Sequence, residues 1–322
     1  MTTNFNILTS AKETLKAESE AILHAMSNLT EDFTKAVESI FNTNGRLIVT
    51  GIGKSAHIGQ KIVATLNSTG TPSMFMHASE AVHGDLGMIT KNDIILCISK
   101  SGNSPEIKVL APLLKRDGNI LIGMTGNAKS FLGKTSDFII NADVTKEADP
   151  NNLAPTTSTT VQLALGDALA VALIEMRNFT AQDFAKFHPG GALGKKLLLK
   201  IADILDKNNT PSVHLSSSIQ EVIFEISNKR LGVTAVIENN QVKGIITDGD
   251  IRRMLEKTAD LSNITATDLM SKNPKTIDIH SKVEDALNLM ESFSITQLVV
   301  TENGLYTGII HLHDILKEGI VS

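Results

Sequence analysis

The stretch that decides the fold is DIILCISKSGNSPEI, from Asp93 to Ile107. Its apolar run, Ile94 to Ile98, predicts a buried strand. Pro105 then opens a helical pattern, with Ser104 in the N-cap position that precedes it. The connection between strand and helix carries three hydroxyl side chains, those of Ser99, Ser101 and Ser104.

This strand, hydroxyl-rich loop and helix N-terminus together form a candidate anion site. The first N–H groups of a helix lack partners within the helix, and the helix dipole favours negative charge there. Serine hydroxyls add donors, and phosphate is the anion that fits such a site best. An ordinary connection whose serines only cap and turn is the alternative.

Composition indicates a globular protein of two or three domains. The chain has 322 residues, of which 42% are hydrophobic and 20% charged. Its net charge of −5 argues against broad attraction to nucleic acid. The longest uninterrupted apolar run is Ala168 to Ile174, and Met1 to Asn6 lacks signal-peptide character, so we expect a cytoplasmic protein without a membrane partner. Cys97, the single cysteine, falls within the apolar strand and is expected to be a buried thiol.

The first half of the chain alternates strands with helices. Residues 9 to 43 predict two amphipathic helices with a break near Thr30. The alternation predicts an α/β fold with a parallel sheet and ligands at the carboxyl ends of its strands. Five β-rich runs follow the helices: Leu47 to Thr50, Met74 to His77, Ile94 to Ile98, Ile120 to Met124 and Phe138 to Ile140.

Gly51-Ile52-Gly53-Lys54-Ser55 follows the first strand and invites comparison with two phosphate motifs. A P-loop needs a glycine where this chain has Ile48, so that interpretation fails. A dinucleotide site needs an acidic residue after the second strand, which ends instead at His77. Gly51 and Gly53 still permit close backbone approach, and Lys54 supplies a positive group near the predicted crevice. A solvated helix-start lysine is the alternative.

Two further residues suggest proton chemistry. Glu147 precedes the hydroxyl cluster Thr156 to Thr160, which leads into a helix that is apolar nearly all round and therefore buried. If Glu147 faces the crevice, desolvation should raise its pKa towards that of a general base; a solvated carboxylate is the alternative. His188 lies in a glycine-rich turn, His-Pro-Gly-Gly, from which it could reach a ligand or a neighbouring subunit, or simply face solvent.

From about residue 200 the chain repeats itself at an offset of 64 residues, so that Gly244 matches Gly308 and Asp250 matches Asp314. Each copy predicts a short β segment, an amphipathic helix, two strands and a helix that begins near the Asp. Two such half-domains are expected to pack on each other, because neither buries its sheet alone.

These motifs carry a family resemblance. Residues 44 to 195 resemble a SIS (sugar isomerase) domain, and the repeat resembles a tandem CBS pair. The combination is similar to the D-arabinose-5-phosphate isomerases of the KpsF/GutQ group. The motifs are Thr-Gly-Ile-Gly-Lys-Ser (50 to 55), His-Gly-Asp-Leu-Gly (83 to 87), Ser-Lys-Ser-Gly-Asn-Ser-Pro-Glu (99 to 106), Leu-Ala-Pro-Thr-Thr-Ser (153 to 158) and His-Pro-Gly-Gly-Ala-Leu-Gly (188 to 194).

The resemblance implies an architecture and a reaction. The fold would be a SIS-type αβα sandwich with a five-stranded parallel sheet (1–200), followed by two CBS repeats of α+β type (201–262 and 263–322). The reaction would interconvert D-ribulose 5-phosphate and D-arabinose 5-phosphate, for Kdo in lipopolysaccharide or capsule. A homotetramer without cofactor or required metal is also implied. A regulatory protein that senses a sugar phosphate without catalysis is the alternative.

The resemblance also implies roles for single residues. Lys54, Glu106, Glu147 and His188 would be catalytic, with Glu147 as the carbon base and Glu106 as the second choice. His83 and His188 could capture inhibitory zinc. Substrate-binding residues would be Gly51, Gly53, Ser55, His77, His83, Ser99, Ser101, Ser104, Thr156 and Ser158.

The two CBS copies differ at their candidate effector site. Thr247 and Asp250 in the first copy resemble the ribose-binding pattern of CBS domains, whereas His311 replaces the matching hydroxyl in the second. We therefore expect at most one nucleotide or sugar-nucleotide effector site, at Thr247 and Asp250.

Overall fold

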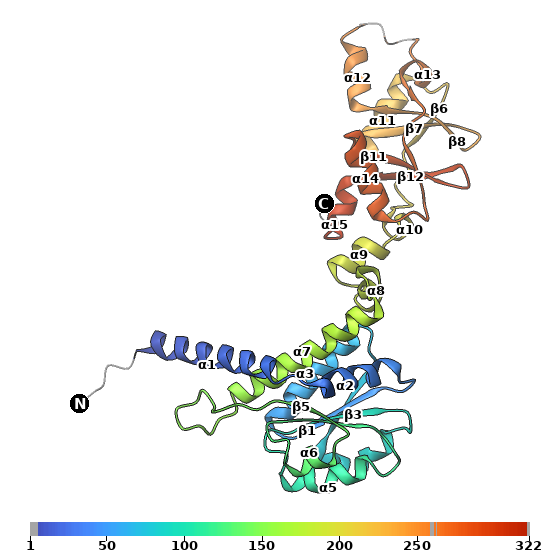
Figure 1. The fold of residues 1–322 in the computed structure, drawn as a ribbon. Coiled ribbons are helices and arrows are strands. Elements are labelled where there is room, and N and C mark those ends of the chain that lie inside the picture. Colours follow the sequence, from blue (N-terminus) through green and yellow to red (C-terminus); the bar gives the residue numbers. More distant parts are fainter. Residues whose placement is uncertain (1–5, 258–260, 262, 321–322) are drawn as a thin grey trace. The chain divides into compact units, whose positions relative to one another are not determined.

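The computed structural model describes residues 6–257, 261 and 263–320. The chain divides into two compact units, Met1–Phe184 and Ala185–Ser322, and each is described by itself (Figure 1). The predicted domain limits at 200 and 262 stay predictions.

The first unit is built on a five-stranded sheet whose neighbouring strands are all parallel. The strand order is β2-β1-β3-β4-β5, so the chain reverses its direction of winding between β2 and β3. All five strands fall where the sequence predicts them, with ends shifted by at most one residue. They are β1 (Leu47–Gly51), β2 (Ser73–His77), β3 (Ile94–Ile98), β4 (Leu121–Thr125) and β5 (Phe138–Asn141).

Helices cover both faces of this sheet and make the predicted αβα sandwich. One core joins the sheet to α1 (Ile7–Ser27), α2 (Glu31–Asn42), α3 (Lys54–Ser68) and α7 (Thr157–Arg177). The other joins it to α4 (Ala78–Ala81), α5 (Pro105–Leu114) and α6 (Phe131–Thr135), with the 3-10 turn η1 (Asp85–Met88) beside it. Successive side chains of β3 alternate between the two cores because a strand points them to opposite faces. Cys97 is fully buried on the second face, and burial raises the pKa of its thiol to about 12.

Helix α7 is long and apolar enough to cross a membrane by length and composition. It is also the helix that the sequence predicts to be buried. In the first unit it packs against α1, α2 and α3, and half of its most apolar window is buried. This packing is that of a core helix, and it accounts for the composition without a membrane.

The second unit contains the two predicted copies, and their elements correspond one to one. The first copy contains β6 (Ser212–His214), α11 (Ile219–Lys229), β7 (Val233–Glu238), β8 (Gln241–Thr247) and α12 (Asp248–Leu255). The second contains β10 (Thr276–Asp278), α14 (Val283–Phe293), β11 (Gln297–Glu302), β12 (Leu305–His311) and α15 (Leu312–Lys317). Short elements accompany them: α9 (Ala192–Leu198), α10 (Ile201–Ile204), α13 (Ala266–Leu269) and β9 (Ser271–Lys272).

The two copies share a buried layer, as predicted for half-domains that cannot bury their sheets alone. Val233 and Ala235 of β7 lie in one apolar cluster with Val299 of β11 and Tyr306 of β12. The Tyr306 hydroxyl donates to the carbonyl oxygen of Pro211 at 2.6 Å, so the polar end of the ring is paired within the core.

Candidate active site

The loop between β3 and α5 commits two of its three serine oxygens to its own backbone. Ser99 Oγ accepts the N–H of Gly102 at 3.1 Å, and Ser101 Oγ accepts the N–H of Asn103 at 3.2 Å. Ser104 is the N-cap of α5, as predicted, but its side chain makes no capping hydrogen bond. The Ser104 Oγ is buried and has no hydrogen-bond partner among the described residues. The loop therefore presents a helix N-terminus with an uncommitted hydroxyl, which suits an anion.

Gly102 determines the course of this loop. Its φ is +62°, and a Cβ on it would overlap Ser130 Oγ. Ser130 is itself buried and caps α6 by accepting the N–H of Gly133 at 3.1 Å. The position thus needs both the left-handed conformation and the missing side chain of glycine.

Glu147, in the loop between β5 and α7, is bound on both carboxylate oxygens. Its side chain has no exposed surface. Oε1 accepts Lys100 Nζ and the Ser158 hydroxyl, each at 2.5 Å. Oε2 accepts the backbone N–H groups of Thr156 at 2.9 Å and Ser158 at 3.0 Å. These N–H groups belong to the N-terminus of α7, where a carboxylate is favoured.

The predicted rise in the pKa of Glu147 is wrong for this arrangement. Burial by itself raises the pKa, as expected from the sequence. The hydrogen bonds from Lys100, Ser158 and Thr156 outweigh burial and lower the pKa of Glu147 to about 2. The sequence could not show this, because the strongest donor lies 47 residues away.

Lys100 is the functional candidate that sequence reasoning missed. It lies between Ser99 and Ser101 in the serine loop, the candidate phosphate site between β3 and α5, and 46% of its side chain is exposed. The one feature of the sequence that could have indicated Lys100 is its position between two serines, directly after the β3 strand. Through Lys100 the serine loop after β3 is joined directly to the loop that carries Glu147.

Glu106 and His83 line one cavity of about 320 Å³ beside the serine loop. Glu106 is exposed in the first turn of α5, and His83 follows α4. The structure thus brings a predicted catalytic carboxylate and a predicted substrate-binding imidazole to a shared space. The remaining lining residues are Ala78, Ser79, Val82, Pro105 and Val109.

The loop after β1 lies beside the serine loop because β1 and β3 are paired in register. A Cβ on Gly51 would lie 3.1 Å from the carbonyl oxygen of Ile98, so glycine permits this close approach of two strand ends. Gly53 has a φ of +60° and precedes α3, and Lys54 is exposed at the first position of that helix.

Ser55 and His77, two further predicted substrate-binding residues, also make structural contacts. Ser55 Oγ donates to Oε1 of Gln162 at 3.1 Å, which fastens α3 to the buried face of α7. His77 Nδ1 lies 2.6 Å from Ser79 Oγ and accepts the Ser79 N–H, so that the ring caps α4. Their binding of substrate stays a prediction.

His188 lies between α8 (Ala181–Phe187) and α9, in the second compact unit. The other predicted catalytic residues belong to the first unit. The catalytic role of His188 and its zinc site with His83 therefore stay predictions. Among the described residues there is no cluster of three or more His, Cys, Asp or Glu side chains suited to a metal ion.

Comparison with known proteins identifies both halves of the chain. Residues 39–172 match the SIS domain, and residues 201–257 and 266–320 match the CBS domain. An arabinose 5-phosphate isomerase KdsD of Yersinia pestis is 47% identical over 96% of this chain and 95% of its own length. The KdsD of Pseudomonas aeruginosa is 45% identical over 100% of this chain and 99% of its own length. The chain belongs to the arabinose 5-phosphate isomerase family.

A solved structure of this group supports the fold assignment. The E. coli CFT073 protein c3406, solved in complex with arabinose 5-phosphate, is 40% identical to this chain. The match covers 58% of this chain and 99% of that one, with a TM-score of 0.56. The predicted resemblance and the SIS-plus-CBS fold class are thereby confirmed.

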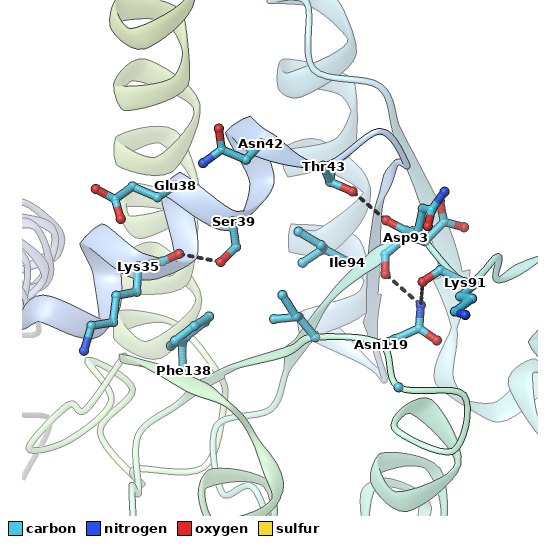
Figure 2. A pocket seen from close by; sticks show the side chains of 13 residues that line it. Lys35, Glu38, Ser39, Asn42, Thr43, Lys91, Asp93, Ile94, Asn119 and Phe138 are labelled. Carbon is cyan, nitrogen blue, oxygen red and sulfur yellow. Dashed lines mark hydrogen bonds between the residues drawn. The ribbon is translucent and has the colours of Figure 1, made fainter.

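A separate cavity of about 520 Å³ lies at the opposite, amino-terminal edge of the isomerase sheet (Figure 2). Its buried polar groups fasten loops: Asp93 binds Arg46 at 2.8 Å, and Asn119 Nδ2 donates to the carbonyl oxygens of Asp93 and Thr90. Asp93 and Asn119 precede their strands, whereas Lys100 follows its own. This cavity is therefore distinct from the candidate active site.

In the second compact unit, which contains both CBS repeats and is called the CBS unit below, the predicted effector residues Thr247 and Asp250 bind each other. Thr247 Oγ1 donates to Asp250 Oδ2 at 2.7 Å and accepts the Asp250 N–H, which closes a capping box at α12. His311 occupies the matching position in the second copy, where its Nδ1 accepts the N–H of His313 at 3.0 Å. The imidazole thus replaces the hydroxyl as a cap for α15, a role that the sequence comparison did not reveal.

A cavity of about 520 Å³ in the CBS unit is lined by the second copy's Asp314 and Lys317 rather than by Thr247 and Asp250. Arg230, at the end of α11, lines it as well. The remaining lining is Asp206, Asn208, Asn209, Asn228, Lys229, Leu231 and Ile309. This cavity makes Asp314 a second candidate for an effector contact.

Proposed function

We propose that this chain interconverts D-ribulose 5-phosphate and D-arabinose 5-phosphate. The observation that carries the proposal is the buried Glu147 carboxylate, joined through Lys100 to a serine loop suited to phosphate. The relatives named arabinose 5-phosphate isomerase align over nearly the whole chain. The solved E. coli structure with arabinose 5-phosphate supports the same substrate class.

The reaction moves one carbon-bound proton and one oxygen-bound proton. In our proposal Glu147 removes a proton from C1 of the ketose, and the electron pair moves into the C1–C2 bond to give an enediolate. Return of the proton to C2, with proton transfer from O1 to O2, gives the aldose. Glu106 or His188 would transfer the proton between O1 and O2, and Lys54 would stabilise the negative charge of the enediolate.

The phosphate would bind at the serine loop, remote from the reacting carbons. Ser104 is the N-cap of α5, and Ser99 and Ser101 precede it in the same loop. The buried Ser104 hydroxyl has no hydrogen-bond partner among the described residues, so it is available to a phosphate. Binding energy from the phosphate would hold C1 and C2 against the carboxylate.

We also propose the finer predictions that accompany this activity: a homotetramer, a cytoplasmic location, a product used for Kdo in lipopolysaccharide or capsule, and no partnership with nucleic acid or membranes. The exposed apolar side chains of α1, including Leu15, Leu23 and Met26, support assembly because they form a helix surface that a neighbouring subunit could cover. Light scattering of the purified chain tests the assembly.

A sensor without catalysis is the competing function. Incubation with a panel of ketose phosphates, read by NMR, separates the two. We expect conversion of D-ribulose 5-phosphate to D-arabinose 5-phosphate. Tight binding of a sugar phosphate without turnover would instead establish the sensor.

A further inference from the structure

The Glu147 carboxylate cannot accept a proton in the arrangement described above. A carbon base needs a free oxygen lone pair directed at the substrate. Each Glu147 oxygen already accepts two hydrogen bonds of 3.0 Å or less, and the side chain has no exposed surface. At least one donor must therefore leave before Glu147 can act.

Lys100 is the donor that can leave. The N–H groups of Thr156 and Ser158 are fixed by the backbone at the start of α7. The Ser158 side chain is itself buried. Lys100, in contrast, has a flexible four-carbon stem that is 46% exposed, so its ammonium group can move without unfolding any element.

The position of Lys100 connects this movement to phosphate. Its neighbours in the chain, Ser99 and Ser101, belong to the loop proposed to hold the phosphate. A phosphate monoester near neutral pH carries about 1.5 to 2 negative charges, against one on a carboxylate, so it competes well for the ammonium group.

We propose that Lys100 is a positioning residue that restrains Glu147 and releases it when a phosphate dianion occupies the serine loop. The inference rests on the proposed isomerase function and adds a condition to it. Phosphate then has two roles: it releases the Glu147 base from Lys100, and it holds the substrate in the site. A pentulose without phosphate would be a poor substrate even when it occupies the site.

The test uses the full-length protein and separates the phosphate from the sugar. Exchange of carbon-bound hydrogen with D₂O is followed by NMR for D-ribulose 5-phosphate and for D-ribulose, the latter with and without inorganic phosphite. In the wild type we expect phosphite to accelerate exchange of D-ribulose by roughly tenfold or more. In Lys100→Met, phosphite-independent exchange should exceed that of the wild type, and the acceleration by phosphite should be lost.

Two comparisons make the result specific. Lys91→Met removes an exposed lysine at the opposite edge of the sheet and should behave as the wild type. The pH profile of D-ribulose exchange is the readout that a merely structural lysine would not move. Its acid limb should shift to higher pH in Lys100→Met, because loss of the ammonium removes the hydrogen bond that lowers the pKa of Glu147 most. Lys100→Gln is the second variant if the Met variant fails to fold, and the same results are expected.

Three outcomes have distinct meanings. Unchanged D-ribulose exchange together with intact phosphite acceleration in a folded Lys100 variant would overturn the inference. Wild-type activity on D-ribulose 5-phosphate without any phosphite effect on D-ribulose would also overturn it. Absence of exchange with D-ribulose 5-phosphate in the wild type would refute the proposed function itself.

Discussion

At the scale of single residues, Glu147 illustrates how a buried charge is kept. A lone carboxylate out of water is strongly unfavourable, so a buried one needs donors on both oxygens. Lys100, Thr156 and Ser158 supply them. While Lys100 is bound, the pKa of Glu147 is lowered to about 2, so the carboxylate is ionised near neutral pH in this arrangement.

The first prediction concerns the identity of the carbon base. Glu147→Gln should reduce deuterium exchange at the substrate carbon by roughly a hundredfold or more, because an amide cannot accept the proton. The KM for D-ribulose 5-phosphate should change little, because the phosphate loop is untouched. Glu106→Gln is the matched control and should retain measurable exchange. If Glu147→Gln keeps exchange and Glu106→Gln loses it, the two assignments must be reversed.

Asp93 gives a prediction about acid stability. Burial raises its pKa, but hydrogen bonds from Arg46 and Thr90 outweigh burial and lower the pKa from 3.8 to about 2. A lowered folded-state pKa stabilises the fold above the unfolded pKa and loses that effect as pH falls through the folded value. Asp93→Asn should thus cost about 2 kcal/mol at neutral pH. In urea titrations, the difference from the wild type should shrink between about pH 4 and pH 2; a difference independent of pH would contradict this origin.

At the scale of elements, local sequence patterns predicted the features that depend on adjacent residues, namely where strands and helices begin and end. The run from Ile94 to Ile98 and the Ser104-Pro105 pair determine where β3 ends and α5 begins, because burial and capping act over a few residues. The contacts of Lys100 with Glu147 and of Ser55 with Gln162 span 47 and 107 residues. No local signal encodes such contacts. The strands and the candidate residue types were therefore predictable, whereas their partners and the pKa of Glu147 were not.

Gly102 in the serine loop and Gly53 in the loop after β1 have nearly equal φ and yield a paired prediction. Gly53→Ala should cost about 2 kcal/mol, because a φ of +60° with a ψ of −130° is strained for alanine although no atom lies within 4 Å of the added Cβ. Gly102→Ala should cost about 3 kcal/mol, because the Cβ also meets Ser130. Thermal unfolding of both variants checks the difference. Equal losses would mean that the loop relaxes around Ser130 without cost.

At the scale of the whole molecule, the isomerase unit holds most predicted catalytic groups and the CBS unit holds a cavity of its own. Three positively charged side chains, Lys229, Arg230 and Lys317, line that cavity together with the carboxylates of Asp206 and Asp314. An anionic effector with a ribose would find both cations and carboxylates there. This observation moves our expectation from Asp250, favoured by the sequence, to Asp314.

Calorimetric titration with AMP tests this expectation on the full chain. Asp314→Ala should weaken binding by roughly tenfold, which corresponds to the loss of one hydrogen bond to a charged group. Asp250→Ala is the comparison and should weaken it less, because Asp250 lies outside the lining of this cavity. The reverse order would restore the sequence-based choice, and absence of AMP binding would require another effector.

The last prediction concerns His188. It is a single catalytic candidate that lies just beyond the last residue of the first compact unit, so truncation of the chain can test it. A chain ending after residue 200 keeps the whole first unit and His188 and should retain isomerase activity. A chain ending after residue 184 should still fold, because its core lies within the first unit, but should lose turnover roughly a hundredfold for want of the imidazole. Full-length His188→Ala is the control and should show the same loss of turnover while the protein stays folded. Activity in the folded 184-residue chain would remove His188 from the mechanism, whereas a folded but inactive 200-residue chain would show that the CBS repeats are needed for catalysis.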